Sequence, residues 1–290
     1  MAQEWLELSA MGHRSSRLHR DENSEAAQAS SCIKHVDSHK ADDRGATPTT
    51  CASDASDSDR GDAEPGDAEA AVEHCGSAAS SEADSGQQFT VSETLVFLDW
   101  DDTILPSTWL QRRSLPLDLG VPLTPKQEKA LSRLSRVAAA VLCQAKRLGR
   151  VVLVTNAEKG WIELSCQRFL PGLFPALEDV KLVSARTEFA SPDEAIAPSD
   201  WKFHAFSHEI HNYFAEESMR KNVLSLGDSA PEREALMRST SRLRNCRTKS
   251  LKFFDRPSVD ELCRQHQMVE CCLRRIVHHN GNLDVTVGAL

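Results

Sequence analysis

Short apolar runs alternate with helical patterns from Phe89 onward, and this alternation constrains the fold more than any other feature. The runs are rich in β-branched and aromatic residues and are nearly continuous in apolar character, which is typical of strands buried on both faces. Helical patterns between such strands favour parallel pairing. We therefore predict one α/β domain over residues 89–290, with a Rossmann-like, doubly wound parallel sheet. The predicted strands are 94–100, 151–156, 180–184, 222–228 and 250–255.

Two of the helical patterns have clear boundaries. One begins at Thr124, a good N-cap residue, followed by Pro125 in the first turn, and it stops at Gly149. The other runs from 257 to about 279. The first helix should bury the apolar residues that recur at helical spacing, which are Leu131, Leu134, Ala138, Val141, Ala145 and Leu148. The sequence leaves open whether residues 282–290 form a final strand.

The first 88 residues differ from the rest in charge and in apolar content. They carry 18 acidic and 7 basic residues, a net charge of −11, whereas the remaining residues carry 25 and 27, a net charge of +2. Residues 11–88 include no Phe, Trp or Tyr. Such a segment cannot bury enough apolar surface to offset the entropy of ordering. We predict that residues 1–88 form a disordered, acidic, low-complexity tail.

Composition also limits where the protein works and what it binds. No apolar run approaches 18 residues and the first 12 residues contain two acids, so we expect neither a transmembrane segment nor a signal peptide. Nine scattered cysteines without a C-x-x-C pair favour a reducing, intracellular compartment, cytoplasmic or nuclear. The basic run 238–249 has no interleaved aromatic residues, so we expect a solvated loop and no nucleic-acid partner.

Three histidines of one predicted helix, His204, His208 and His211, are a candidate metal site that we set aside. Their spacing places them on one face of the helix, toward the solvent. The string HEIH also differs from the H-E-x-x-H zinc pattern, because position 212 is Asn. We expect a solvated helix face there.

Polar residues gather where the predicted strands end. The first strand ends at Asp99 and is followed by Asp101 and Asp102, the second ends at Thr155 and Asn156, and the fourth ends at Gly227 and Asp228. In open parallel sheets, ligands bind beyond the carboxyl ends of the strands. The alternative for Asp101 and Asp102 is an ordinary turn with helix-capping acids.

These strand ends resemble the four motifs of phosphatases in the haloacid-dehalogenase-like (HAD) superfamily. The sequence from Asp99 to Thr103, DWDDT, matches the D-x-D-x-T motif. Thr155 matches the second motif, and GDSAPE, which contains Asp228 and Glu232, matches the fourth. Lys202 is the best candidate for the third. The motifs occur in the family's order over residues 94–232.

Lys181 and Arg186 remain alternatives to Lys202 for the third-motif cation, because both lie near it in the sequence.

The resemblance implies a Mg²⁺-dependent phosphatase. Asp99 would be the nucleophile, and the metal would be held by Asp99, the Asp101 backbone carbonyl and Asp228, with Glu232 holding a metal-bound water or supporting Asp228. The Asp101 side chain would act as general acid and base. Thr155 would hydrogen-bond a phosphoryl oxygen, and Lys202 would balance negative charge.

The resemblance also distinguishes phosphatases from other subclasses of the superfamily. Relatives that do not hydrolyse phosphoesters lack an acid at the position of Asp101. Trp100 departs from the family's usual small or aliphatic residue, and strand alternation allows its indole to point away from the site.

Only about 20 residues separate Thr103 from Thr124, too few for a cap domain. An open site favours a large substrate such as a phosphoprotein. The alternative is a catalytically inactive phosphate-binding or protein-interaction module of the same fold. The sequence does not predict the oligomeric state.

Overall fold

The computed structural model describes residues 33–35, 88–118, 120–190 and 196–288. The chain divides into two units, Met1–Val36 with Gln87–Leu290 and Asp37–Gly86, and every described residue belongs to the first. Of the predicted tail, only Ile33–His35 and Gln88 fall within these ranges. The prediction of disorder therefore lies outside the described residues.

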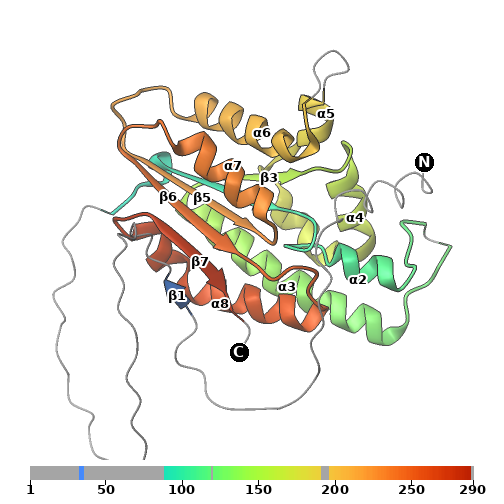
Figure 1. Cartoon of the computed structure of the whole chain (residues 1–290). Coiled ribbons are helices and arrows are strands. Elements are labelled where there is room, and N and C mark those ends of the chain that lie inside the picture. The colour runs from blue at the N-terminus through green and yellow to red at the C-terminus, as the bar shows by residue number, and fades with distance from the viewer. Residues whose placement is uncertain (1–32, 36–87, 119, 191–195, 289–290) are drawn as a thin grey trace, which may run out of the picture. The chain divides into compact units, whose positions relative to one another are not determined.

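A sheet of six parallel strands forms the centre of the fold (Figure 1). A short strand, β1 (Ile33–His35), pairs antiparallel with β7. The prediction of an α/β fold with a parallel sheet is confirmed. In spatial order the six parallel strands are β7 (Leu283–Val287), β6 (Cys246–Lys252), β5 (Lys221–Gly227), β2 (Thr94–Asp99), β3 (Arg150–Thr155) and β4 (Lys181–Ser184).

The two C-terminal strands show where sequence patterns are weak. The open segment 282–290 does form a strand, β7. The strand predicted at 250–255 instead spans Cys246–Lys252, because polar residues of the basic run enter the sheet and are buried there. The prediction that 238–249 is a solvated loop is wrong at both ends of the run: residues 238–240 end the helix α7 (Ala230–Thr240), and residues 246–249 begin β6, where Lys249 is fully buried.

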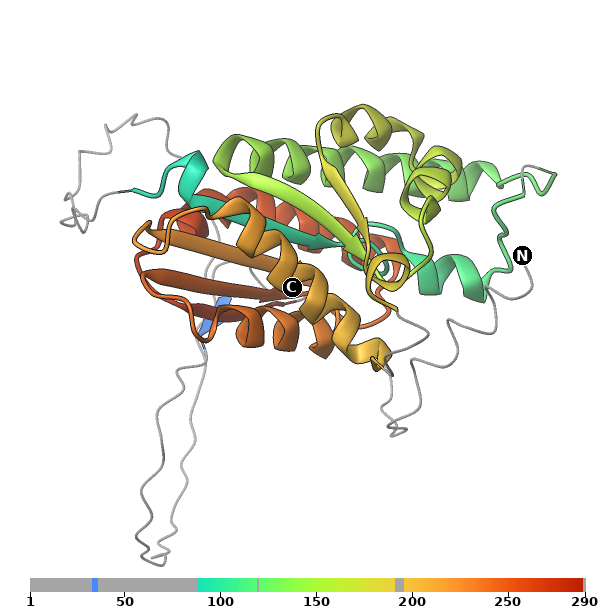
Figure 2. The ribbon, with the colours of Figure 1, turned by 90° about the horizontal axis from the view of Figure 1, so that it is seen from above.

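Helices cover both faces of the sheet, as Figures 1 and 2 show. Alternate strand residues face opposite ways: Val96 and Leu98 pack in one core cluster, whereas Leu95 and Phe97 pack in the other. The first cluster includes residues of α3 (Pro125–Leu148), α4 (Trp161–Phe169), the 3-10 helix η2 (Pro171–Leu177) and α8 (Val259–His278). The second includes α5 (Ala185–Phe189), α6 (Pro198–Tyr213) and α7 (Ala230–Thr240).

The capping signals that predicted α3 operate as expected. The Thr124 hydroxyl accepts a hydrogen bond from the Gln127 backbone N–H (3.3 Å), and Gln127 Oε1 accepts one from the Thr124 N–H (2.8 Å). Pro125 occupies the first helical position and Gly149 follows the last. These contacts satisfy backbone groups that have no partner inside the helix. Of the six apolar residues predicted to be buried, all except the half-buried Leu148 are buried.

The strand order places the carboxyl ends of β2, β3 and β5 side by side. The chain moves outward from β2 through β3 to β4, then returns to β5 on the other side of β2. The order therefore reverses between β2 and β5, the position at which open sheets of this kind form a ligand crevice.

One crossover departs from the usual handedness. The β6–α8–β7 connection has the opposite hand to the other four, because α8 packs on the same face as α3. This arrangement brings α8 beneath the loop that follows β2.

Two short helices complete the described fold: η1 (Val91–Glu93) precedes β2 and α2 (Ser107–Arg112) follows it. Within the described ranges, none of the helices combines the length and apolar character needed to cross a bilayer. The six cysteines in those ranges are free thiols.

Candidate active site

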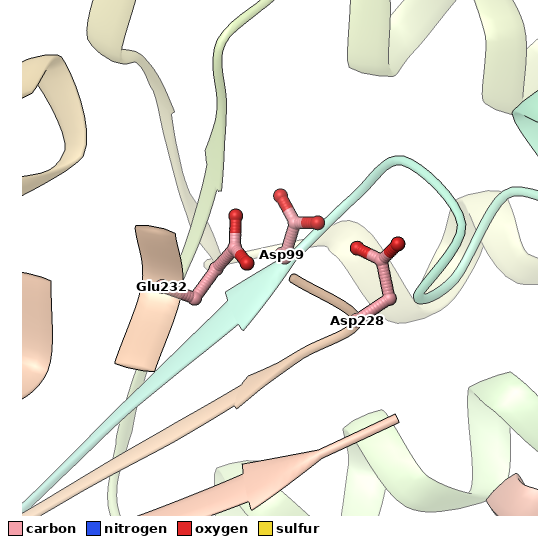
Figure 3. Close-up of side chains that lie close together, drawn as sticks. All are labelled: Asp99, Asp228 and Glu232. Atoms are coloured by element: carbon pink, nitrogen blue, oxygen red, sulfur yellow. The ribbon is translucent and has the colours of Figure 1, made fainter. Parts of the chain in front are cut away.

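Three carboxylates meet at the carboxyl ends of the central strands. Asp99 ends β2, Asp228 follows β5, and Glu232 lies in the first turn of α7 (Figure 3). One oxygen from each lies within 4.8 Å of the others. The three residues are between 4% and 8% exposed. This cluster is buried negative charge, which is unfavourable unless it is neutralised by a cation or a proton.

Lys202 of α6 supplies one cation. Its Nζ lies 2.5 Å from Asp99 Oδ1 and also donates to Glu232 Oε1. Burial alone would favour the neutral amine, but the two carboxylates raise the pKa of Lys202 above its ordinary value. The side chain is therefore an ammonium ion at neutral pH, wedged between two acids.

The carboxylates themselves respond in opposite directions. Burial raises the pKa of Asp99 to about 7, with Lys202 opposing the shift and Glu232 reinforcing it. Burial, together with the negative charges of Asp99 and Glu232, raises the pKa of Asp228 to about 10. Burial also opposes ionisation of Glu232, but Lys202 more than offsets it and the Glu232 pKa falls. One lysine is thus too little positive charge for three acids.

The spacing of the GDSAPE motif follows from how Glu232 is held. Glu232 Oε2 accepts hydrogen bonds from the Ser229 backbone N–H (3.0 Å) and from the Ser229 hydroxyl, forming a capping box at the start of α7. A Cβ on Gly227 would lie 2.6 Å from Glu232 Cγ. Glycine at 227 therefore makes room for the Glu232 side chain beside Lys202.

Asp101 lies two residues beyond Asp99, and both of its carboxylate oxygens are held. Thr155 at the end of β3 donates its hydroxyl proton to Asp101 Oδ2 (2.8 Å), and Trp161 Nε1 donates to Oδ1 (3.0 Å). Burial raises the Asp101 pKa, while these two hydrogen bonds oppose the increase. Asp101 is half-buried, and its carboxyl group is held in a fixed orientation, a suitable arrangement for proton transfer.

Asp102 has a different role, which fits the capping alternative. Its backbone φ is 53°, and its Oδ1 accepts a hydrogen bond from the Thr108 N–H (2.8 Å) at the start of α2. The Trp100 carbonyl accepts the N–H groups of Ile104 and Leu105 at 2.9 Å each, which closes the loop tightly. Asp102 therefore shapes the turn that presents its two acidic neighbours.

Trp100 points away from the carboxylates. Its indole is fully buried on the α3 face, and its Nε1 donates to the Ser165 hydroxyl in α4 (2.9 Å). The expected strand alternation explains this direction, because Asp99 and Trp100 project from opposite sides of the chain.

Two contacts at the site have no clear signal in the sequence. Trp161, which holds Asp101, begins α4 directly after Gly160, whose φ is 92°. His266 of α8 is buried and hydrogen-bonds through Nε2 to the Thr103 carbonyl oxygen (2.9 Å). Burial lowers the His266 pKa to about 4, so the ring is neutral and donates this bond. The Thr103 hydroxyl in turn donates a hydrogen bond to Asp99 Oδ2 (3.4 Å).

The two alternatives to Lys202 lie in other ion pairs. Lys181 Nζ is 2.5 Å from Glu209, and Arg186 Nη1 is 3.7 Å from Glu158. Lys202 is the candidate of the three whose side chain contacts Asp99.

The three histidines of α6 are not part of the group of described residues that could hold a metal. His208 hydrogen-bonds Asn212 (2.8 Å), the His204 ring contacts Phe203, and His211 is exposed. Among the described residues, the group that could hold a metal consists of carboxylates alone.

Comparison with protein-family models, curated proteins and solved structures finds no match. The resemblance to HAD phosphatases therefore rests on the residues of this chain and on their arrangement.

Proposed function

We propose that this protein is a Mg²⁺-dependent phosphatase that forms an aspartyl-phosphate on Asp99. The observation that carries the proposal is the arrangement around Asp99. This acid lies beside a buried lysine and a second acid, Asp228, and a separately oriented acid, Asp101, follows two residues later. An acid that serves only as a turn or a cap has no need of a buried ammonium ion.

The carboxylate cluster suits a divalent cation. Asp99 and Asp228 present hard oxygen ligands within 4.8 Å of each other. Their raised pKa values reflect burial and, after it, neighbouring negative charge that Lys202 does not balance. Both oxygens of Glu232 already accept hydrogen bonds, so we assign Glu232 to hold Lys202 and to support Asp228. The Asp101 carbonyl would complete the protein ligands. Bound Mg²⁺ would reduce the repulsion between an anionic phosphoester and the carboxylates.

In the first step, an Asp99 oxygen would form a bond to phosphorus as the ester P–O bond breaks. The leaving oxygen would take a proton from Asp101, whose orientation is fixed by Thr155 and Trp161. Lys202 would stabilise negative charge on the transferred group. The raised Asp101 pKa is consistent with a proton donor at this position.

In the second step, a water molecule would attack the aspartyl-phosphate. Asp101, now ionised, would accept a proton from that water as the bond between Asp99 and phosphorus breaks. Inorganic phosphate would leave, and Asp99 and Asp101 would return to their starting states. Thr155, which lies at the end of β3 beside the site, would keep Asp101 oriented in both steps, because its hydroxyl proton is donated to Asp101 Oδ2.

The substrate class we propose is a phosphoprotein or another large phosphoester. Only 25 residues separate β2 from α3 and only 13 separate β4 from α6. Among the described residues of these connections, the helices are the six-residue α2 and the five-residue α5. Neither connection has the length of a cap domain. Without such a domain, a bulky substrate can reach the carboxyl ends of the strands.

The test is hydrolysis of an aryl phosphate and of phosphopeptides in Mg²⁺ and in EDTA, comparing the wild type with Asp99→Asn. We expect Mg²⁺-dependent turnover that falls by at least about 10³-fold in the variant. Asp255→Asn, which removes an exposed acid after β6, is the matched control and should retain full activity. Equal rates for the wild type and Asp99→Asn would refute the nucleophile, and no turnover on any substrate would favour the inactive phosphate-binding or interaction module.

A further inference from the structure

His266 of α8 contacts the loop that begins with Asp99, the proposed nucleophile. The ring is 1% exposed, and its Nε2 lies 2.9 Å from the Thr103 carbonyl oxygen. A carbonyl oxygen only accepts hydrogen bonds, so Nε2 carries the proton and donates it. Burial lowers the pKa of His266, which keeps the ring neutral at pH 7. The bond therefore holds the loop without adding positive charge beside the carboxylates.

The other ring nitrogen of His266 is energetically unfavourable where it lies. Within the described part of the chain, Nδ1 is buried and has no hydrogen-bond partner. Leucine or phenylalanine would fill the same space without burying an unpaired acceptor. Residues that break a packing rule in this way are expected at functional sites. The feature that distinguishes His266 from an apolar core residue is its bond to the Thr103 carbonyl.

Thr103 connects this bond to the nucleophile. The residue is fully buried, and its hydroxyl donates to Asp99 Oδ2 (3.4 Å). The carbonyl and the hydroxyl belong to the same residue, so a shift of the carbonyl moves the hydroxyl with it. His266 therefore acts on the direction of the Asp99 carboxylate through one intervening residue.

The His266 ring also contacts a residue that supports the second aspartate of the cluster. Phe253 follows β6, and its ring packs edge-on against His266 with the ring centroids 5.5 Å apart. The Phe253 backbone N–H donates to the Gly227 carbonyl (2.8 Å), one residue before Asp228. His266 thus links the loop after β2 to the segment that holds the end of β5. These are the two strand ends that present Asp99 and Asp228.

The unusual path of α8 brings His266 to this position. The helix packs beside α3, on the face that carries Trp100 (Figure 1). A right-handed β6–α8–β7 connection would have placed it on the opposite face, with α6 and α7. The C-terminal helix therefore contributes to the site and does not only connect two outer strands.

We propose that His266 is a positioning residue that holds the Asp99 nucleophile through Thr103. This inference rests on the proposed phosphatase function. A displacement of about 1 Å at a reacting group can lower kcat by about 10²-fold. Substrate affinity depends on the metal and on Lys202, which this hydrogen bond does not contact, so KM should change much less than kcat.

The experiment compares kcat and KM for an aryl phosphate at saturating Mg²⁺ in the full chain and three variants. His266→Phe keeps a ring against Phe253 but removes the donor, so kcat should fall about 10- to 100-fold while KM changes less than about threefold. His266→Gln restores a donor nitrogen at the same number of bonds from Cα and should recover most of the lost kcat.

Val277→Ala is the matched control for a general loss of stability. Val277 is buried on the same helix, 11 residues or about 16 Å further along its axis. The substitution should lower Tm and leave kcat unchanged at temperatures well below Tm. Wild-type kcat in His266→Phe, an equally slow His266→Gln, or an equal loss of kcat in Val277→Ala would each overturn the proposal.

A second measurement does not depend on turnover. In the isotopically labelled, metal-free full chain, the backbone amide signals of Asp99 and Asp228 should shift in His266→Phe and lie near their wild-type positions in His266→Gln. Unchanged signals in His266→Phe would overturn the proposed link, whatever the kinetics. A wild type without turnover would instead refute the proposed function, and these signals would still show whether His266 positions the two strand ends.

Discussion

The buried lysine between two acids makes a quantitative prediction for stability. Lys202→Met removes the ammonium ion that contacts Asp99 and Glu232, and leaves both carboxylates about 95% buried without it. Removing one partner of a buried ion pair typically costs about 3–5 kcal/mol. For a domain of this size, each kcal/mol lowers Tm by about 2–4 °C, so we expect a fall of about 6–20 °C.

The measurement is thermal and urea unfolding in EDTA, so that no divalent cation replaces the lost charge. Lys129→Met, an exposed position on α3, is the control and should change stability by less than about 0.5 kcal/mol. The triple variant Lys202→Met, Asp99→Asn, Glu232→Gln removes the orphaned charges with the lysine, and it should be more stable than Lys202→Met alone. A loss below about 1 kcal/mol for Lys202→Met, or a triple variant less stable than the single one, would refute the charge-balance argument.

Three further predictions concern other parts of the fold. Gly227→Ala should cost about 1–3 kcal/mol, because its Cβ would lie 2.6 Å from Glu232 Cγ, and chemical denaturation measures this. Thr124→Ala removes the N-cap of α3 and should lower the free energy of unfolding by about 1 kcal/mol, measured as a lower urea midpoint with an unchanged m value. Lys249 has a folded pKa of about 7, below its unfolded value, so the unfolded state binds more protons between these values. Stability should therefore rise by up to about 4 kcal/mol between pH 7 and pH 10 in phosphate-free buffer, and Lys249→Met should flatten this rise; an equal slope in the variant would contradict the assignment.

The strand ends were the most predictable part of the site. Apolar runs mark buried parallel strands, and a parallel sheet necessarily gathers its carboxyl ends at one edge. Asp99, Thr155 and Asp228 could therefore be grouped from chain order alone. Lys202 could be selected only by resemblance, because nothing local distinguishes it from Lys181 or Arg186 before the helix is packed.

The residues that sequence reasoning missed depend on packing between distant segments. Trp161 reaches Asp101 from α4, and His266 reaches the Thr103 carbonyl across 163 positions in sequence. Neither residue belongs to a motif of fixed spacing. The burial of Lys249 was missed for a related reason: its neutral partners, Asn222 and the Val277 carbonyl, come from other elements, so the residue reads as surface charge in the sequence.

The most direct test of the central claim is to identify the residue that carries phosphate during turnover. The full-length protein would be mixed with an aryl phosphate and Mg²⁺, quenched in acid within a turnover, digested and examined by mass spectrometry. The account predicts an acid-stable, hydroxylamine-labile phosphoryl group on Asp99, which is absent from Asp99→Asn and from a sample mixed with EDTA in place of Mg²⁺. Turnover with phosphate on another residue, or with no phosphorylated intermediate at all, would contradict it.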